Sequence, residues 1–368
     1  MRKKRLLFCA YYLDLGGIET ALINLLKRLD YNKVEVTLLL EKKEGVFLDE
    51  VPNNVKIEHY KLHEDKFVLL RKIKNRLKLI MWILKNKNRY DFAACFATYS
   101  IPGSILSRMA SSNNAIWIHS NYYHVYHENK NEMKKFFLDR KIEKFKKLVF
   151  VSEESKEDFL KIFPNLKNKS LVLNNYIDDK LILKKQKEKI AFKKKNVFTL
   201  LFVGRLEERA KKLTRLIKVM EQLKNEKIIC QLLVVGDGPD SDFYKEIVKD
   251  KNLEKEIIFL GKKKNPYPYF KLCDLVVLTS DYEGFPVVCL ESMILNKPFL
   301  TTINLHDKYI NLSDYGIIVS KEVIVIKEKI KEVINNGLPG FKKFDILKYQ
   351  NKLNQDFNQL IGEDINEN

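Results

Sequence analysis

The most constraining feature of this chain is a repeated alternation between short apolar runs and longer segments with helical periodicity. The apolar runs have the length and composition of strands that are buried on both faces, as in a parallel sheet. Alternation of such strands with helices predicts parallel βαβ units. The alternation occurs twice, on either side of a Lys-rich polar stretch at residues 178–196. The sequence therefore predicts an α/β protein of two doubly wound, Rossmann-like domains joined by a charged linker.

The expected elements set the domain limits. In the first series we expect strands at 6–10, 34–40, 92–97, 115–118, 148–151 and 171–173, and helices at 18–29, 66–87 and 131–146. In the second we expect strands at 199–203, 231–235, 257–260, 275–279, 299–302 and 317–319, and helices at 213–223, 241–249 and 323–334. A chain of 368 residues is long for one core. We predict an N-terminal domain over 1–178, a C-terminal domain over 197–344, and a last helix within 345–368 that returns to the N-terminal domain.

The cysteines and the start of the chain bear on the compartment. Five cysteines are scattered without a C-x-x-C pair, which argues against a disulfide framework and a zinc site and suits a reducing cytoplasm. The basic residues 2–5 precede an apolar run as in a signal peptide, but Asp14 ends that run early, so a first strand is the preferred interpretation. No stretch is long and apolar enough to span a membrane. We expect a cytoplasmic protein.

Positive charge is concentrated in the first half. Of the net charge of +19, residues 1–190 carry +15, from 38 Lys and Arg against 23 Asp and Glu. Residues 66–90 hold nine Lys or Arg and no acid, and apolar residues recur there at helical spacing: Leu70, Ile73, Leu77, Ile80 and Leu84. A basic amphipathic helix over 66–89 predicts contact with an anionic membrane. An ordinary domain helix that buries one face fits the pattern equally well.

Residues 280–291 combine a strand end, a turn and a helix start. The apolar strand 275–279 leads into a turn that contains Glu283, and Pro286 stands where a first helical residue belongs. The carboxyl end of a parallel strand is where ligands bind, and a helix amino terminus favours a phosphate. Glu291 follows five residues after Pro286. The two carboxylates would therefore meet the two ends of a ligand whose phosphates lie at the turn.

Glycine turns follow two other strands. Gly204 ends the strand at 199–203, and Arg205 and Lys211 come next, so the two cations would converge on a diphosphate unless they are ordinary solvated side chains. Gly16 and Gly17 lie between the first strand and the first helix, where glycine lets the backbone approach a phosphate. Their spacing is not the dinucleotide fingerprint, so NAD and FAD are not expected.

Two further strand ends contribute candidates. Gly236 and Gly238 form a turn that would line a nucleotide cleft, and the nearby aspartates lack the spacing of a calcium loop, so we expect no metal site. His119 follows the strand at 115–118 and would face the crevice, although a lone histidine is more often structural. His124 and His127 lie in the Tyr-rich segment that follows.

Taken together, these residues resemble a retaining GT-B glycosyltransferase of family 4 (glycosyl transferases group 1), of the type that builds bacterial cell-surface polysaccharides. The resemblance covers nearly the whole chain. It rests on Gly16-Gly17, Val203–Leu206 with Lys211, Val235–Pro239, Glu283 to Glu291 with Gly284-Phe285-Pro286, and Asn174–Asp178. This chain departs from the family pattern at Lys212, where glycine is usual, and at residues 301–305, which replace a glycine pair.

The resemblance implies an active site between two domains and a role for each motif. Arg205 and Lys211 would neutralise the departing diphosphate, Glu283 would hold hydroxyls of the donor sugar, and His119 would lie near the anomeric carbon. Nucleotide-sugar contacts would come from Gly16, Gly17, Gly204, Gly236, Gly238, Gly284, Phe285, Pro286 and, at the ribose hydroxyls, Glu291. The resemblance implies no bound metal and no cofactor besides the donor.

The expected activity is transfer of a hexose from a nucleotide-sugar, expected to be a UDP-sugar, to a lipid-linked or growing surface glycan at the inner face of the membrane. Two alternatives stay open: a nucleotide-sugar epimerase of the same architecture, and a non-catalytic polyanion-binding protein. Nucleic acid is not an expected partner, because no nucleic-acid-binding motif accompanies the charge.

Overall fold

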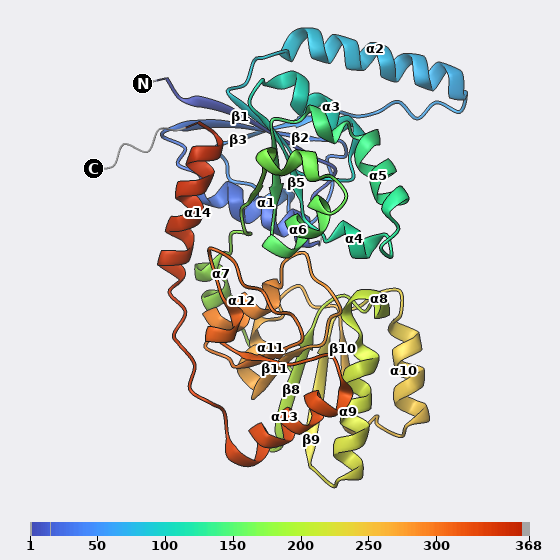
Figure 1. Cartoon of the computed structure of the whole chain (residues 1–368), viewed down its shortest axis with the longest axis vertical. Coiled ribbons are helices and arrows are strands. Elements are labelled where there is room, and N and C mark those ends of the chain that lie inside the picture. Colours follow the sequence, from blue (N-terminus) through green and yellow to red (C-terminus); the bar gives the residue numbers. More distant parts are fainter. Residues whose placement is uncertain (1, 15, 363–368) are drawn as a thin grey trace. The chain divides into compact units, whose positions relative to one another are not determined.

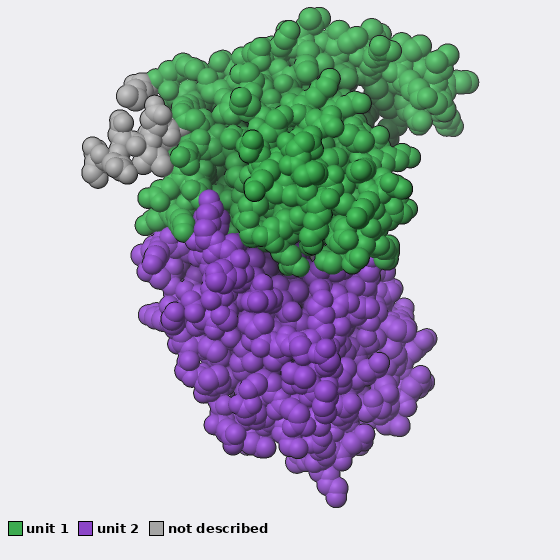
Figure 2. Space-filling view, viewed as in Figure 1, with its two compact units in different colours: residues 1–177, 350–368 green, residues 178–349 purple. Residues whose placement is uncertain are grey.

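The computed structural model describes residues 2–14 and 16–362 and divides them into two compact units (Figure 2). Unit 1 comprises the described chain up to Ile177 and the segment from Gln350 onward, and unit 2 comprises Asp178–Tyr349. Each unit is built around one fully parallel sheet with helices (Figure 1). The predicted α/β class with two Rossmann-like domains is confirmed.

The sheet of unit 1 has seven strands in the order β3-β2-β1-β4-β5-β6-β7. Its strands are β1 (Lys4–Ala10), β2 (Val34–Leu40), β3 (Val55–His59), β4 (Phe92–Cys95), β5 (Asn114–Ile118), β6 (Lys147–Phe150) and β7 (Ser170–Val172). Its helices are α1 (Gly17–Arg28), α2 (Val68–Asn86), α3 (Ile101–Ala110), α4 (Tyr122–Val125), α5 (Lys130–Asp139) and α6 (Glu153–Leu160). Short 3-10 turns lie at Leu48–Glu50, Ile142–Lys144 and Pro164–Lys169. In Figure 1, α2 and α3 lie on one side of this sheet and α1 on the other.

The last helix, α14 (Ile346–Leu360), leaves unit 2 and continues into unit 1. Gln350 Nε2 donates to the carbonyl of Ile177 at 3.0 Å, and Asn113 Nδ2 donates to the carbonyl of Leu360 at 3.3 Å. These bonds join the end of the chain to unit 1. The remainder of the segment expected at 345–368, residues 363–368, lies outside the described residues.

The sheet of unit 2 has six strands in the order β10-β9-β8-β11-β12-β13. Its strands are β8 (Phe198–Val203), β9 (Cys230–Val235), β10 (Ile257–Gly261), β11 (Leu275–Leu278), β12 (Phe299–Thr301) and β13 (Ile317–Ile318). Its helices are α7 (Asp179–Lys185), α8 (Glu208–Lys211), α9 (Leu213–Asn225), α10 (Ser241–Asp250), α11 (Tyr267–Leu272), α12 (Val287–Ile294) and α13 (Val323–Asn336), with a 3-10 turn at Leu312–Asp314.

The sequence suggested that the segment 178–196 is a simple charged linker, but the structure shows that part of it is helical. It begins with α7, whose first turn is capped by the Asp178 carboxylate, which accepts from the backbone N–H of Leu181 at 3.0 Å. The helix packs beside α11 and α12 of unit 2. The Lys-rich composition gave no signal for this short helix, in which Ile182 is the buried residue.

The core of unit 2 follows directly from the apolar pattern. Strand residues such as Leu200 and Phe202 are fully buried, as the unbroken apolar runs predict for strands covered on both faces. On α9 the buried side chains recur at three- and four-residue spacing, so one stripe of that helix faces the sheet. The buried residues of α9 are Leu213, Leu216, Ile217, Val219, Met220 and Leu223.

The sequence did not predict β3 or the helices α3, α4, α6, α7, α8 and α11. β3 is an edge strand that pairs only with β2, and its residues alternate between apolar and polar instead of forming an apolar run. α3 carries Pro102 and Gly103, which are turn signals, yet its first turn tolerates proline and is capped by the Ser100 hydroxyl, which accepts from the N–H of Gly103. α5 ends at Asp139 rather than near residue 146, because the chain turns at Lys141 with φ +54°.

Each sheet has one point at which the strand order reverses. In unit 1 this point lies between β1 and β4, and in unit 2 it lies between β8 and β11. The loops that leave the carboxyl ends of two such strands run to opposite faces of the sheet and leave a crevice where ligands bind. The turns after β8 and β11 carry Arg205, Lys211 and Glu283, so the topology of unit 2 gathers them at one edge.

Among the described residues, no helix is both long and apolar enough to cross a bilayer.

Candidate active site

An ion pair between Lys211 and Glu283 forms the centre of the site in unit 2. Lys211 ends α8 and Glu283 lies in the turn after β11, 72 residues away. Lys211 Nζ donates to Glu283 Oε1 at 2.6 Å, and the hydroxyl of Ser280 donates to the same oxygen at 2.6 Å. The two side chains are only 20% and 11% exposed. Short charge-assisted bonds in a shielded position fix both groups, so the structure brings together two of the four predicted catalytic residues.

The turn after β11 is bonded to α8 by further contacts. The backbone N–H of Asp281 donates to the carbonyl of Ala210 at 2.8 Å, and the hydroxyl of Thr279 lies 3.2 Å from the carbonyl of Lys212. Arg215 from α9 pairs with the Asp281 carboxylate at 2.7 Å. Sequence patterns did not indicate Arg215, because an arginine in the first turn of a helix carries no motif. These bonds hold the Lys211–Glu283 pair in register.

Lys212 has a left-handed backbone, with φ +49° between α8 and α9. A residue with a Cβ adopts this conformation at a cost on the order of 1 kcal/mol, which glycine avoids. The conformation gives a physical reason why glycine is usual here in the family that the sequence resembles. In this chain the Lys212 ammonium lies 3.7 Å from both Glu208 and Asp281 and so gains an electrostatic contact instead.

Arg205 lies apart from the ion pair. Its side chain is 69% exposed, and its guanidinium is 3.7 Å from the carboxylate of Glu207. The structure therefore does not join the two predicted cations at one group, since Lys211 is bonded to Glu283. Convergence of Arg205 and Lys211 on a diphosphate stays a prediction.

Glu291 lies on α12, whose start differs slightly from the expectation. Pro286 is the residue before the helix rather than its first residue, because its ψ of 71° is not helical, and Phe285 before it is buried. Glu291 Oε1 accepts a hydrogen bond from the hydroxyl of Tyr267 at 3.1 Å. Burial raises the pKa of Glu291 to about 7, and the Tyr267 bond partly opposes that rise. Tyr267 was missed, because it lies 24 residues away on α11.

Cys289 shows that Glu283 and Glu291 share one neighbourhood. Burial raises the pKa of this thiol, the charges of both carboxylates raise it further, and the Lys211 charge lowers it. Cys289 lies in the first turn of α12 and is fully buried. The charges of the two carboxylates thus both act on one buried thiol near the start of α12.

The raised pKa of Glu291 predicts a pH dependence of stability. Between its ordinary value of 4.5 and about 7, the folded protein keeps a proton on Glu291 that the unfolded chain has lost. The free energy of unfolding therefore falls as the pH rises through this window, by about 3 kcal/mol at about 1.4 kcal/mol per unit. Denaturant unfolding of the wild type and of Glu291→Gln across pH 4.5 to 7.5 isolates this group. Parallel stability profiles for the two proteins would contradict the shift.

Gly236 and Gly238 have a packing role that the sequence did not reveal. Gly236 has φ +151°, and a Cβ there would lie 1.8 Å from the carbonyl oxygen of Gly204. A Cβ on Gly238 would lie 2.3 Å from the carbonyl oxygen of Leu206. The turns after β8 and β9 are also bonded, since Leu206 N–H donates to the carbonyl of Asp237 at 3.0 Å. These two glycines therefore let two backbones touch, and their place in the lining of a nucleotide cleft stays a prediction.

The aspartates beside these glycines are committed to protein contacts. Asp237 accepts from the Gly238 N–H at 2.8 Å and from the Ser241 hydroxyl at 2.5 Å, and its pKa is lowered by these bonds. Asp240 accepts from the backbone N–H of Glu208 at 2.7 Å. Hydrogen bonds of this kind stabilise the turn, as expected for aspartates in loops.

Gly16 and Gly17 begin α1 in unit 1. Gly16 precedes the helix with an extended backbone, and Gly17 is its first residue, so neither glycine is required by a left-handed turn. A Cβ on Gly16 would lie 2.2 Å from a carboxylate oxygen of Glu19, whereas one on Gly17 would meet nothing within 4 Å. Glu19 is buried, which raises its pKa, and the Tyr99 hydroxyl lies 3.5 Å from it. A side chain at Gly16 would therefore have to displace the carboxylate of Glu19.

His119 is a neutral, buried histidine. Its Nε2 donates to the carbonyl of Phe96 at 3.1 Å, and burial lowers the pKa of the ring to about 3. Nδ1 is therefore an unprotonated acceptor, and it is a buried atom without a hydrogen-bond partner among the described residues. Such a ring can accept a hydrogen bond from a hydroxyl group, but it cannot act as a cationic acid near neutral pH.

One group in unit 1 has the composition of a metal site. A nitrogen of His124 and carboxylate oxygens of Glu154 and Asp158 lie within 4.8 Å of one another. Asp158, however, already accepts from Asn121 Nδ2 at 2.7 Å and from Lys161 Nζ at 2.6 Å. The lysine charge competes with a cation for this carboxylate, so the cluster fits an ion-paired structural contact better than a metal centre.

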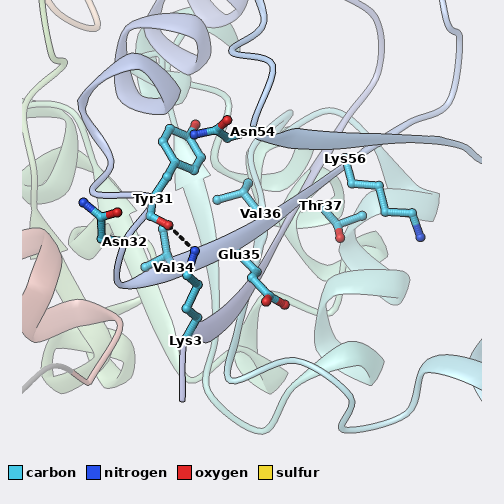
Figure 3. Close-up of a pocket in the computed structure, with 9 residues that line it drawn as sticks. All are labelled: Lys3, Tyr31, Asn32, Val34, Glu35, Val36, Thr37, Asn54 and Lys56. Carbon is cyan, nitrogen blue, oxygen red and sulfur yellow. Dashed lines mark hydrogen bonds between the residues drawn. The ribbon is translucent and has the colours of Figure 1, made fainter. Parts of the chain in front are cut away.

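A surface concavity of about 510 Å³ lies elsewhere in unit 1 (Figure 3). Its lining residues are Lys3, Tyr31, Asn32, Val34, Glu35, Val36, Thr37, Asn54 and Lys56. Lys3 Nζ donates to the carbonyl of Tyr31 across it at 2.7 Å. Several of these residues lie at the amino ends of β1, β2 and β3, opposite to the edge where doubly wound sheets bind ligands. The concavity therefore lies away from the ligand-binding edge of its own sheet.

Comparisons with known proteins show which proteins this chain resembles. An uncharacterised glycosyltransferase of Methanocaldococcus jannaschii is 26% identical over 298 residues, which cover 67% of this chain and 73% of that protein. The N-acetylgalactosamine-N,N'-diacetylbacillosaminyl-diphospho-undecaprenol 4-alpha-N-acetylgalactosaminyltransferase of Campylobacter jejuni is 33% identical over 142 residues, 39% of this chain and 37% of that enzyme.

Solved structures share the fold over nearly the full length. Anabaena HepE in complex with UDP has a TM-score of 0.73 at 18% identity and covers 96% of this chain and 100% of its own. The lipopolysaccharide outer core galactosyltransferase WaaB has a TM-score of 0.66 at 17% identity, with coverages of 97% and 99%. Residues 15–181 match the Glycosyltransferase Family 4 model, and residues 184–354 match the model for Glycosyl transferases group 1. The chain therefore belongs to the group 1 glycosyltransferases of GT-B fold.

Proposed function

We propose that this enzyme is a retaining transferase that moves a hexose from a UDP-sugar to a lipid-linked or growing surface glycan. The observation that carries the proposal is the Lys211–Glu283 ion pair at the strand-order reversal of unit 2. Glu291 lies nearby in the chain, about one turn into α12. A cation and a carboxylate fixed at the same edge suit a ligand with an anionic part and a hydroxylated part.

Each carboxylate receives a separate task in this proposal. Glu283 accepts hydrogen bonds from hydroxyls of the donor sugar, and its bond to Lys211 holds it in place. Glu291 accepts from the ribose hydroxyls, beside the hydroxyl of Tyr267. A ribose presents two adjacent donors, which a carboxylate with two oxygens can accept together. The half-buried position of Glu291 strengthens such bonds, because water competes less for the carboxylate.

Lys211 and Arg205 stabilise the departing diphosphate. An ammonium has three N–H donors, and the bond to Glu283 uses one of them. Arg205 is exposed on a long side chain and can reorient, so it supplies the second positive charge. The backbone at Gly284 and Phe285, at the start of α12, adds the partial positive charge of a helix amino terminus. Positive groups directed at developing charge are the largest contribution to many transfer reactions.

Unit 1 contributes His119 and the start of α1. We assign His119 a position near the anomeric carbon, where its unprotonated Nδ1 is the acceptor that the ring retains. Gly16 and Gly17 place the amino terminus of α1 for a phosphate. No divalent metal takes part in this proposal, because the aspartates nearest the turn after β8 are bonded within the protein.

The choice of donor, acceptor and location rests on relatives and chemistry. HepE binds UDP, and the Campylobacter relative is named for a diphospho-undecaprenol acceptor. A polyprenyl-linked acceptor stays at a bilayer surface, so we place the enzyme peripherally on the cytoplasmic face of the membrane. An epimerase would convert the donor with no acceptor present, whereas a polyanion-binding protein would bind no nucleotide-sugar.

Donor binding provides the first test. UDP is expected to raise the melting temperature more than GDP or CDP, with no change after addition of EDTA, and UDP-sugars that also stabilise are then assayed for transfer. Glu291→Ala should weaken UDP binding about tenfold, which corresponds to about 1.4 kcal/mol and to the loss of charge-assisted bonds to the ribose. The control is Glu246→Ala, which removes an exposed carboxylate of α10. Absence of any nucleotide effect in the wild type, or equal affinity in the two variants, would refute the proposal.

A further inference from the structure

The helix α2 has an apolar face that no part of the described chain covers. Its large apolar side chains at Leu70, Ile73, Leu77, Ile80, Met81 and Leu84 are between 43% and 78% exposed, and Phe67 and Leu69 beside them are exposed as well. At about 100° per residue, the first six fall on one stripe of the helix. From the sequence pattern alone, this stripe could equally well be a membrane-contacting face or a face buried within the domain.

The opposite face of α2 is the one that packs against unit 1. Leu79 and Trp82 contact the core beneath the helix, which includes Leu106 of α3. Asn75 forms two bonds with the backbone of His63, at 2.7 and 3.1 Å. Asn86 is buried. Because α2 is already anchored by this face, its apolar stripe is turned outward, and the helix lies along the outside of unit 1 (Figure 1).

Basic side chains flank the apolar stripe on both sides. At helical spacing, Arg76 and Lys87 fall on one flank of the stripe, and Arg71 and Lys85 fall on the other; all four are exposed. Residues 66–90 contain nine Lys or Arg and no acid. An apolar stripe between two basic rows is the arrangement of a helix that lies in the plane of a membrane interface.

We infer that the outward face of α2 docks this protein onto an anionic phospholipid membrane. The stripe enters the boundary between headgroups and acyl chains, and the flanking cations contact lipid phosphates. Charge favours this occupant over a second copy of the chain, because two such faces would bring like charges together. The site is separate from the transferase residues of unit 2, so it stands or fails independently of them.

Vesicle sedimentation with the full-length protein tests the inference. The wild type should bind vesicles that contain phosphatidylglycerol more tightly than pure phosphatidylcholine vesicles, and added salt should weaken the binding. Leu77→Glu with Leu84→Glu, at side chains 55% and 78% exposed, should lower the partition coefficient about a hundredfold without changing the melting temperature. The matched control is Ile229→Glu with Leu347→Glu, which alters exposed apolar residues outside α2.

Three outcomes would overturn the inference: equal vesicle binding by the wild type and the α2 variant, equal loss in the control variant, or a wild-type dimer that the α2 variant converts to monomer without any vesicle binding. Arg76→Gln with Lys87→Gln should in addition reduce the salt dependence of binding. Donor hydrolysis measured without membranes should be unchanged in all of these variants. A failure of vesicle binding is thereby distinguished from a failure of the transferase proposal.

Discussion

Glu283→Gln is expected to lower the turnover of sugar transfer by about a thousandfold or more, while UDP affinity changes by less than about threefold. The carboxamide keeps the size of the side chain but loses the charge that meets Lys211 and the donor hydroxyls. UDP release measures turnover, and isothermal titration with UDP measures nucleotide affinity. Near-normal turnover in this variant would refute the role of the ion pair.

A double-mutant cycle separates the role of the pair from the loss of a single group. Lys211→Gln alone leaves Glu283 without its ammonium partner, and Glu283→Gln alone leaves Lys211 without its carboxylate. If the two residues act as one unit, the double variant should lose little more turnover than either single variant. Melting temperatures of all three variants provide the control for folding. Fully additive losses would show that the two residues act independently.

Gly236→Ala is expected to lower the free energy of unfolding by about 2 to 4 kcal/mol, the largest stability effect in this set. The added Cβ would lie 1.8 Å from the carbonyl oxygen of Gly204 at a φ of +151°, so the turns after β8 and β9 have to separate. This movement also displaces Arg205, and turnover should fall with stability. Denaturant unfolding and a transfer assay measure the two effects.

Gly340→Ala is the matched control for that substitution. Gly340 also lies in unit 2, and a Cβ there would meet no atom within 4 Å. The free energy of unfolding of the Gly340→Ala variant should differ from that of the wild type by less than about 0.5 kcal/mol, as for an ordinary surface substitution. Equal stability of the two alanine variants would show that the contact at Gly236 relaxes without cost.

Much of the fold could be predicted, because a strand that is buried on both faces must be apolar throughout. All twelve predicted strands agree with observed ones within two residues at each end, as with 34–40 and β2 (Val34–Leu40). The strand that was missed, β3, is an edge strand whose alternating residues satisfy only one buried face. The helices that were missed are short or begin with Pro and Gly, so local signals favoured turns.

The site residues could be predicted as a set but not as a geometry. The turn after β11 indicated Glu283 by its position at a strand end, and the turn after β8 indicated Lys211. Their direct bond is visible only in the structure, because the order of strands in the sheet, not the spacing in the chain, makes the two turns neighbours. Tyr267 and Arg215 belong to the same site and carry no signal in the sequence.

The sequence by itself determined the class of fold, the family and the residue types available for binding phosphate and sugar. Those properties depend on local composition, since periodicity and turn residues act over a few positions. Tertiary structure decided which groups meet and which surfaces stay open. The apolar stripe of α2 shows this most directly: periodicity found the stripe, but only the packing of Leu79 and Trp82 beneath the helix determined that the stripe faces outward.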